Sequence, residues 1–222
     1  MTARAGTVEA LYPFLYDGED AAPDARADAL TASAAAKLQE SAALRRATLE
    51  QHADALVMCA FAVHRALACG GALFVLGNGG SSTDADALAR AISEIRPAHA
   101  AALTSETAVL TALANDIGFE HAAARHLAAL VRPGDVVVAI STSGSSPNLV
   151  RALEVGKERH AVTVALSGTG GGRFAELDVD YCFAVPSSSV HRIQESQTAI
   201  YEVLVQLVGH LYERGAAHGP EE

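Results

Sequence analysis

Five short, mostly apolar runs that alternate with helix-like segments limit the fold of this chain more than any other feature. The runs rarely alternate between apolar and polar residues, which is typical of strands buried on both faces. They comprise residues 72–76, 100–103, 136–140, 162–166 and 181–185. Such strands with helices between them predict an α/β fold, a three-layer αβα sandwich with a five-stranded parallel sheet and right-handed crossovers.

The segments around these runs have helical spacing. We expect helices at about 82–93, 105–114, 119–130, 147–158, 172–177 and 191–214. Residues 31–68 are rich in helix formers and predict one long helix or two, ended by Gly70 and Gly71. We therefore divide the chain into a lead-in over residues 1–30 and one domain over residues 31–216, which includes the N-terminal helix or helices.

Composition excludes several classes of protein. The chain has 222 residues, of which 50% are hydrophobic, and this is enough for one sizeable core. A formal net charge of -10 without clustered Lys or Arg argues against a nucleic-acid partner. The three cysteines are widely spaced and favour neither a zinc pattern nor disulfides, so we expect a cytoplasmic protein. The longest apolar stretch, residues 55–63, is too short to cross a membrane.

Two turns rich in serine and glycine each follow a predicted strand and open a predicted helix. We call residues 77–82 the first turn and residues 141–147 the serine loop. Because parallel strands share one carboxyl edge, both turns should lie together and form a cradle of backbone N–H groups and hydroxyls. The first turn has neither the GxGxxG spacing of a dinucleotide site nor the lysine of a P-loop, so the sequence favours a phosphorylated small molecule over a nucleotide.

Part of the serine loop has a local explanation. Ser146 can cap the following helix, and Pro147 suits the first helical position. Capping does not explain the three consecutive hydroxyls of Ser141, Thr142 and Ser143 at the end of a strand. Polar groups at such a position need partners, so they favour a bound ligand.

Four motifs together resemble the sugar isomerase (SIS) domain of the phosphoheptose isomerase type. They are Gly-Asn-Gly-Gly-Ser at 77–81 with Asp84, Thr-Ala-Leu-Ala-Asn-Asp at 111–116, the serine loop, and Arg-Ile-Gln-Glu at 192–195. The resemblance runs from about residue 40 to 214. It implies a flavodoxin-like αβα sandwich, a homotetramer with sites at subunit interfaces, and conversion of sedoheptulose 7-phosphate to a heptose phosphate.

The same resemblance implies roles for individual residues. The sugar phosphate would be held by the serine loop with help from the first turn, through Ser141, Thr142, Ser143, Ser146, Asn78, Gly79 and Ser81. Asp116 would contact sugar hydroxyls, although an Asn-Asp pair can also simply close a turn. Gln194 corresponds to a family residue that binds zinc.

The positions that carry the family's chemistry differ here. Isomerisation needs a base that moves a proton between neighbouring carbons, and a donor or metal for the oxygens of the enediol. In the family, a His and a Glu four residues apart bind zinc after the first turn, and the Glu is also the base; Ala87 and Ala91 occupy these positions. Glu202 occupies the position of the second histidine, which follows Gln194 on the last helix. We therefore expect no metal and no cofactor.

A replacement base would have to come from another acidic residue. The candidates are Glu94, Glu195 and Glu202, with His191 as the acid. Each also has a structural interpretation as a solvated, paired or capping residue. Gln194 and Glu202 lie on one helical stripe with Thr198, and this stripe could face a ligand.

Two functions from different classes follow from these residues. The first is an enzyme, a phosphosugar aldose-ketose isomerase that acts through an enediol on sedoheptulose 7-phosphate or a related sugar phosphate. The second is a catalytically silent protein that binds a sugar phosphate or serves as an assembly partner. The family favours the first function, and the missing zinc ligands favour the second.

Overall fold

The computed structural model describes residues 23–95 and 98–217. Contacts divide the chain into two units, Met1–Ala43 and Leu44–Glu222. The described residues of the first unit all belong to helix α2 (Pro23–Ala68), which continues into the second. Residues 31–68 thus form part of a single helix, and it begins at Pro23, within the segment expected as a lead-in. Residues 1–22 of that segment lie outside the described residues.

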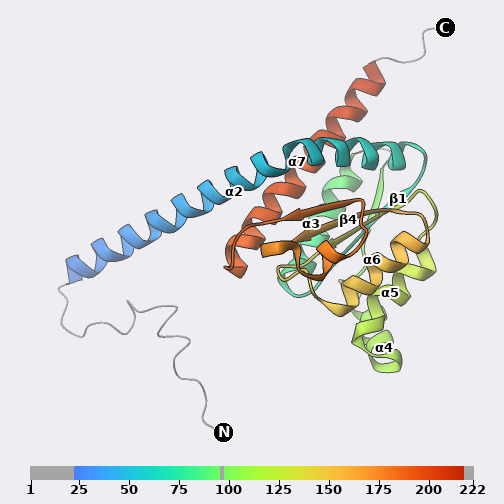
Figure 1. Ribbon diagram of the computed structural model, residues 1–222, viewed down its shortest axis with the longest axis horizontal. Coiled ribbons are helices and arrows are strands. Elements are labelled where there is room, and N and C mark those ends of the chain that lie inside the picture. The colour runs from blue at the N-terminus through green and yellow to red at the C-terminus, as the bar shows by residue number, and fades with distance from the viewer. Residues whose placement is uncertain (1–22, 96–97, 218–222) are drawn as a thin grey trace. The chain divides into compact units, whose positions relative to one another are not determined.

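The second unit contains the predicted parallel sheet (Figure 1). Its strands are β1 (Ala72–Gly77), β2 (His99–Ala102), β3 (Val136–Ile140), β4 (Val162–Ser167) and β5 (Tyr181–Ala184). They are all parallel, in the order β2-β1-β3-β4-β5. The sheet confirms the predicted fold, because all five apolar runs became strands. The chain adds β2 on one side of β1 and then β3 on the other side, so the strand order reverses between β1 and β3. Ligands of such sheets bind at this position, outside the carboxyl ends of the two strands.

Alternate residues of each strand face different helical layers. Leu73 and Val75 pack in one core cluster, whereas Phe74 and Leu76 pack in the other. The first layer contains the part of α2 from Leu44 onward, α3 (Gly80–Glu94) and α7 (Val190–Ala217). The second contains α5 (Phe119–Leu130), α6 (Pro147–Glu158) and the 3-10 turn η2 (Thr169–Glu176).

The segment after β4 differs from the prediction of a helix at 172–177. The backbone instead forms η2, a 3-10 turn that begins at Thr169, and Gly170, Gly171 and Gly172 inside it have φ values of 71, 80 and 56°. Residues with a side chain rarely adopt this left-handed conformation, so the three glycines prevent a regular helix. We call residues 168–172 the glycine loop.

Helix α4 (Thr107–Ile117) stands apart from both core clusters. It packs mainly beside α5, as Figure 1 shows, and none of its residues is buried, although most of them are apolar. The apolar side chains of α4 are therefore accessible for contacts with another surface. Over the described residues, we find no helix whose length and apolar character would let it span a bilayer.

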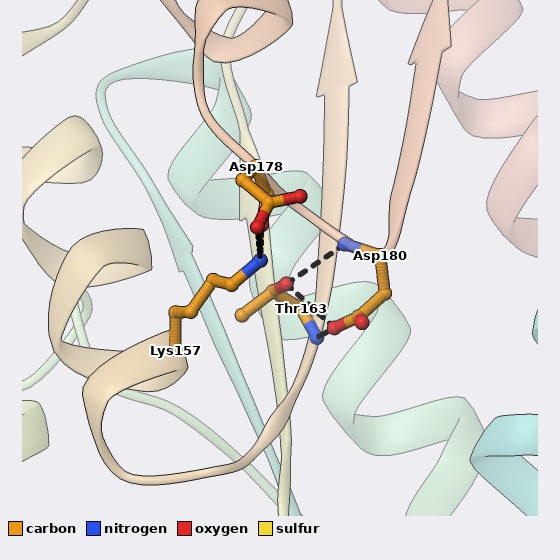
Figure 2. Close-up of polar contacts among 4 residues, drawn as sticks. All are labelled: Lys157, Thr163, Asp178 and Asp180. Atoms are coloured by element: carbon orange, nitrogen blue, oxygen red, sulfur yellow. Dashed lines mark hydrogen bonds and ion pairs between the residues drawn. The ribbon is translucent and has the colours of Figure 1, made fainter.

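Carboxylates hold the amino end of the sheet together. Asp180 Oδ2 accepts hydrogen bonds of 2.8 Å from both the backbone N–H and the hydroxyl of Thr163, and the Asp180 N–H donates to that hydroxyl over 3.0 Å (Figure 2). Lys157 at the end of α6 forms an ion pair with Asp178 in the same view. These contacts fix the start of β5 against β4.

Candidate functional site

The first turn and the serine loop meet at the carboxyl edge of the sheet. Strands β1 and β3 are neighbours, and each is followed by one of the two turns. The Asn78 side-chain amide donates to Asn148 Oδ1 over 2.9 Å, and the Asn148 amide donates back to Asn78 Oδ1 over 2.9 Å. Asn148 is buried in the first turn of α6. This reciprocal pair fixes the two turns side by side.

Three hydroxyls of the serine loop converge on one point. Ser141 Oγ lies 3.3 Å from both Ser143 Oγ and Ser146 Oγ, and it accepts a hydrogen bond of 3.1 Å from the Gly144 N–H. Ser146 occupies the N-cap position of α6, but its hydroxyl makes no capping bond, so the capping interpretation of this side chain is wrong. Together with half-buried Thr142, these hydroxyls form an uncharged donor cluster at a helix N-terminus.

The glycine loop and the two residues after it pack against the serine loop. Gly144 has a φ of 61°, and a β-carbon there would lie 2.2 Å from the Gly171 carbonyl oxygen. The Phe174 N–H donates to the Gly144 carbonyl, and the Arg173 N–H donates to Ser145 Oγ. Sequence reasoning missed this support. The signal was the cluster of four glycines at 168 and 170–172, which follows a strand as the other two turns do.

The first turn also depends on a close backbone approach. A β-carbon on Gly77 would lie 2.1 Å from the Ser81 carbonyl oxygen. Gly79 has a φ of 55°, and Ser81 is buried in the first turn of α3. A β-carbon on Gly80 would lie 2.8 Å from Gln194 Nε2, so helix α7 contacts the turn directly. These glycines explain why the chain passes so tightly from β1 into α3.

A pocket of about 280 Å³ is lined in part by Gln194, the residue that contacts the first turn at Gly80. Three helices line it, because α2 contributes Arg45, α3 contributes Asp84, and α7 contributes the rest. The lining residues are Arg45, Asp84, His191, Gln194, Glu195 and Thr198. We call it the α7 pocket. All six residues have polar side chains whose stems add apolar surface, a mixture that suits the hydroxyl groups and the carbon chain of a sugar.

Asp84 is the buried carboxyl group of the α7 pocket. It accepts hydrogen bonds from Gln194 Nε2 over 2.9 Å and from the Tyr201 hydroxyl over 3.4 Å. Burial raises the pKa of the Asp84 carboxyl above its usual value, and the hydrogen bonds from Gln194 and Tyr201 oppose this shift. Asp84 therefore joins α3 to α7 at the edge of the pocket.

The structure brings together two of the four candidate acid-base residues. His191 and Glu195 both line the α7 pocket, and Glu195 forms a hydrogen-bonded ion pair of 2.8 Å with Arg192. Glu94 is exposed at the end of α3, and Glu202 is exposed on α7 beyond the pocket. Neither of these two residues lines the pocket. Of the predicted helical stripe, Gln194 and Thr198 line the pocket and Glu202 does not.

Asp116 is on helix α4, outside the α7 pocket. It is exposed on α4, and the side-chain amide of Asn115 donates to its Oδ1 over 3.0 Å. It is not among the residues that line the α7 pocket. Its contact with Asn115 is a local one within α4.

The residues present do not fit a zinc centre. Ala87 is exposed and Ala91 is half-buried on α3, and a methyl group cannot bind a metal. The remaining amide of Gln194 donates from its nitrogen to Asp84. Among residues 23–95 and 98–217, we find no group of three His, Cys, Asp or Glu residues that could hold a metal ion. The α7 pocket has the chemistry of a hydrogen-bonding site.

Gln197 joins α7 to the serine loop, and the sequence did not single it out. Its side chain is fully buried, and Nε2 donates to the Ser141 carbonyl oxygen over 3.1 Å. Its Oε1 has no hydrogen-bond partner among the described atoms. No local pattern marks this contact, because the two residues are far apart in the chain and meet only after α7 packs on the sheet.

This fold and site define an SIS-domain protein. A sequence profile described as the SIS domain matches residues 38–168, and the chain belongs to this family. Among curated proteins it is similar to the phosphoheptose isomerase of Aquifex aeolicus, with 41% identity over 175 residues that cover 77% of this chain and 91% of that protein. It is also 42% identical to the phosphoheptose isomerase of Rhodospirillum rubrum, over 70% of this chain and 85% of the relative.

Solved structures give the same result. The phosphoheptose isomerase of Neisseria gonorrhoeae has a TM-score of 0.77 and 34% identity, and the match covers 81% of this chain and 98% of that one. The corresponding enzyme of Francisella tularensis has a TM-score of 0.76 and 28% identity, over 81% and 98% of the two chains. The family resemblance stated from the motifs is therefore confirmed.

Proposed function

We propose that this protein is a phosphosugar aldose-ketose isomerase of the phosphoheptose isomerase type, with sedoheptulose 7-phosphate or a related sugar phosphate as its substrate. The observation that carries this proposal is the convergence of Ser141, Ser143 and Ser146 at the N-terminus of α6. Phosphate binds well where hydroxyls and free backbone N–H groups meet. The names of the curated relatives support the choice of a heptose phosphate.

The proposed binding site has two parts. The serine loop, with Thr142 and the first-turn residues Asn78, Gly79 and Ser81, holds the phosphate group. The sugar extends into the α7 pocket, where Gln194 and Thr198 contact its hydroxyls. Glu195 and His191 are the acid-base candidates in this pocket, one to take the proton from a carbon next to the carbonyl and one to protonate the enediol oxygen. We also propose that Asp116 joins the site only from another copy of the chain.

Solvent exchange tests this proposal. An enediol step exposes the transferred proton to water, so turnover in D2O should place deuterium on the carbon next to the product carbonyl. We expect NMR of sedoheptulose 7-phosphate with the purified protein to show both an aldose product and this label. A matched sample with Glu195→Gln should lose both signals while still binding the sugar phosphate. Unchanged turnover in that variant would remove Glu195 from the mechanism.

A second function, binding without turnover, has one specific observation in its favour. Ala87 and Ala91 occupy the positions that carry two zinc ligands and the base in the family, and a methyl group supplies neither function. If calorimetry detects sugar-phosphate binding but NMR detects neither product nor deuterium, the protein is a sensor or assembly partner. Absence of binding would contradict both functions.

We propose that the protein works without zinc. Metal analysis of the purified protein should give less than one zinc per chain. As a control, the triple variant Ala87→His, Ala91→Glu, Glu202→His restores the expected family ligands beside Gln194 and should gain zinc. Stoichiometric zinc in the unaltered protein would contradict this proposal, because it would reveal a ligand set other than the one considered.

We propose a homotetramer in the cytoplasm. Support for self-association comes from apolar side chains on α2 that remain exposed, Val57, Met58 and Phe61, and from α4, which has no buried residue in one copy. Support for a reducing compartment comes from three cysteines that are all free thiols. Light scattering after size exclusion should give four times the chain mass, and Phe61→Glu should reduce it.

A further inference from the structure

We infer that Arg45 of helix α2 is a specificity-determining residue that binds the sugar portion of the substrate, and not its phosphate. This inference rests on the proposed function. Arg45 lines the α7 pocket together with residues from α3 and α7, although it lies far from them in the sequence. It comes from the long helix that precedes the sheet, where no motif had indicated a ligand contact.

The charges around the pocket leave Arg45 available for a ligand. Asp84 already accepts hydrogen bonds from Gln194 and Tyr201, and Glu195 is already bonded to Arg192. Among the described residues that line the pocket, Arg45 is the only Arg or Lys. Its guanidinium presents five N–H donors in a fixed geometry, and it stays charged at every relevant pH. These donors match hydroxyl and carbonyl oxygens of a sugar chain.

The serine loop and the α7 pocket divide the substrate between them. The serine loop supplies hydroxyls and backbone N–H groups for the phosphate and needs no cation. Gln194 lines the pocket and also contacts the first turn at Gly80, and in our proposal a sugar anchored by its phosphate extends past Gln194 toward Arg45. In this arrangement, a positive charge stands beside the oxygens on which negative charge develops when a carbonyl becomes an enediolate.

Calorimetry with two probes separates these roles. We expect Arg45→Gln to weaken binding of sedoheptulose 7-phosphate by about tenfold, since the hydrogen bonds lost come from a charged donor. Binding of inorganic phosphate should stay unchanged, because it uses only the serine loop. The matched control is Arg46→Gln, which removes an exposed arginine next along α2 that does not line the pocket. It should leave both affinities unchanged, and Arg45→Lys should restore part of the loss.

Three results would overturn the inference. Equal affinities of Arg45→Gln and Arg46→Gln for the sugar phosphate would show that Arg45 makes no contact, while leaving the proposed function intact. Equal losses for sugar phosphate and inorganic phosphate in Arg45→Gln would place the effect at the serine loop or in the fold. Failure of the unaltered protein to bind sedoheptulose 7-phosphate would remove the proposed function, and this inference with it.

Discussion

The two ends of the sheet use opposite chemistry to satisfy their backbone groups. At the amino end, buried Asp135 accepts hydrogen bonds of 2.8 Å from the Ala72 N–H and 2.7 Å from the Arg132 N–H. Asp180 accepts bonds of 2.8 Å from Thr163 in the same way. At the carboxyl end, the serine loop has no carboxylate, and its hydroxyls contact each other over 3.3 Å.

The difference between carboxylates at one end and hydroxyls at the other places groups for stability and groups for binding at opposite ends of the sheet. A carboxylate that bonds two backbone donors is satisfied by the protein itself, and it would also repel an anionic ligand. Hydroxyls have spare donors and carry no charge, so they can turn toward a phosphate. We therefore expect changes at the amino end to alter stability alone, and changes in the serine loop to alter mainly binding.

The largest effect that we expect is that of Gly144→Ala, which should reduce both stability and phosphate binding. The new β-carbon would lie 2.2 Å from the Gly171 carbonyl oxygen at a φ of 61°. Thermal unfolding should show a loss of about 4 kcal/mol, and calorimetry should detect no phosphate binding. Gly134→Ala is the control, because Gly134 has a φ of 89° with open space around it, and it should cost only about 1 kcal/mol. Equal costs would show that the glycine loop does not support the serine loop.

The double variant Ser141→Ala, Ser143→Ala should come next in size. It removes two hydroxyl donors from the phosphate, each worth about 1–3 kcal/mol in a charge-assisted bond, so the affinity for phosphate should fall by about a hundredfold or more. The free energy of unfolding should also fall, by about 1–2 kcal/mol, because the buried Gly144 N–H loses its acceptor. Ser93→Ala, at an exposed hydroxyl that bonds the Ala100 carbonyl, serves as control and should bind normally. Unchanged affinity in the double variant would contradict the assignment of the serine loop to the phosphate.

Asp135→Ala tests the amino end of the sheet. Two backbone donors would lose their partner at a site that is 5% exposed, so the free energy of unfolding should fall by about 2–3 kcal/mol. Asp135→Asn retains one acceptor and should lose about half as much. The affinity of either folded variant for phosphate should equal that of the unaltered protein. A loss of affinity would show that the two ends of the sheet are coupled.

Asp84 is the exception at the site end, and the smallest effect should arise there. Because burial raises its pKa in the folded state above the unfolded value of 3.8, the folded protein holds the proton more tightly. Stability from this group is therefore present below pH 3.8 and decreases as the pH rises through the folded pKa. Chemical denaturation at several pH values should show that the unfolding free energy of Asp84→Asn, relative to the unaltered protein, increases over this range. A pH-independent difference would contradict the shift.

The sheet was predictable because its strands are buried on both faces. Runs such as 136–140 are short and continuously apolar, which is typical of a strand between two helical layers. The 3-10 turn after β4 was predicted wrongly, since residues 172–177 have helical spacing but the glycines before them adopt positive φ. The sequence offered a local cap as one explanation of Ser146, yet its hydroxyl makes no capping bond and lies 3.3 Å from Ser141 Oγ.

The sequence by itself determined the class of fold, the position of both turns at one edge of the sheet, and the replacement of expected metal ligands by Ala87 and Ala91. These features are local, because periodicity, glycine and side-chain type act within a few residues. Only the tertiary structure decided that Asn78 pairs with Asn148, that Gln197 holds the serine loop, and that Arg45 lines the α7 pocket. Such contacts join residues that are distant in the chain, and their geometry depends on how α2, α3 and α7 pack on the sheet.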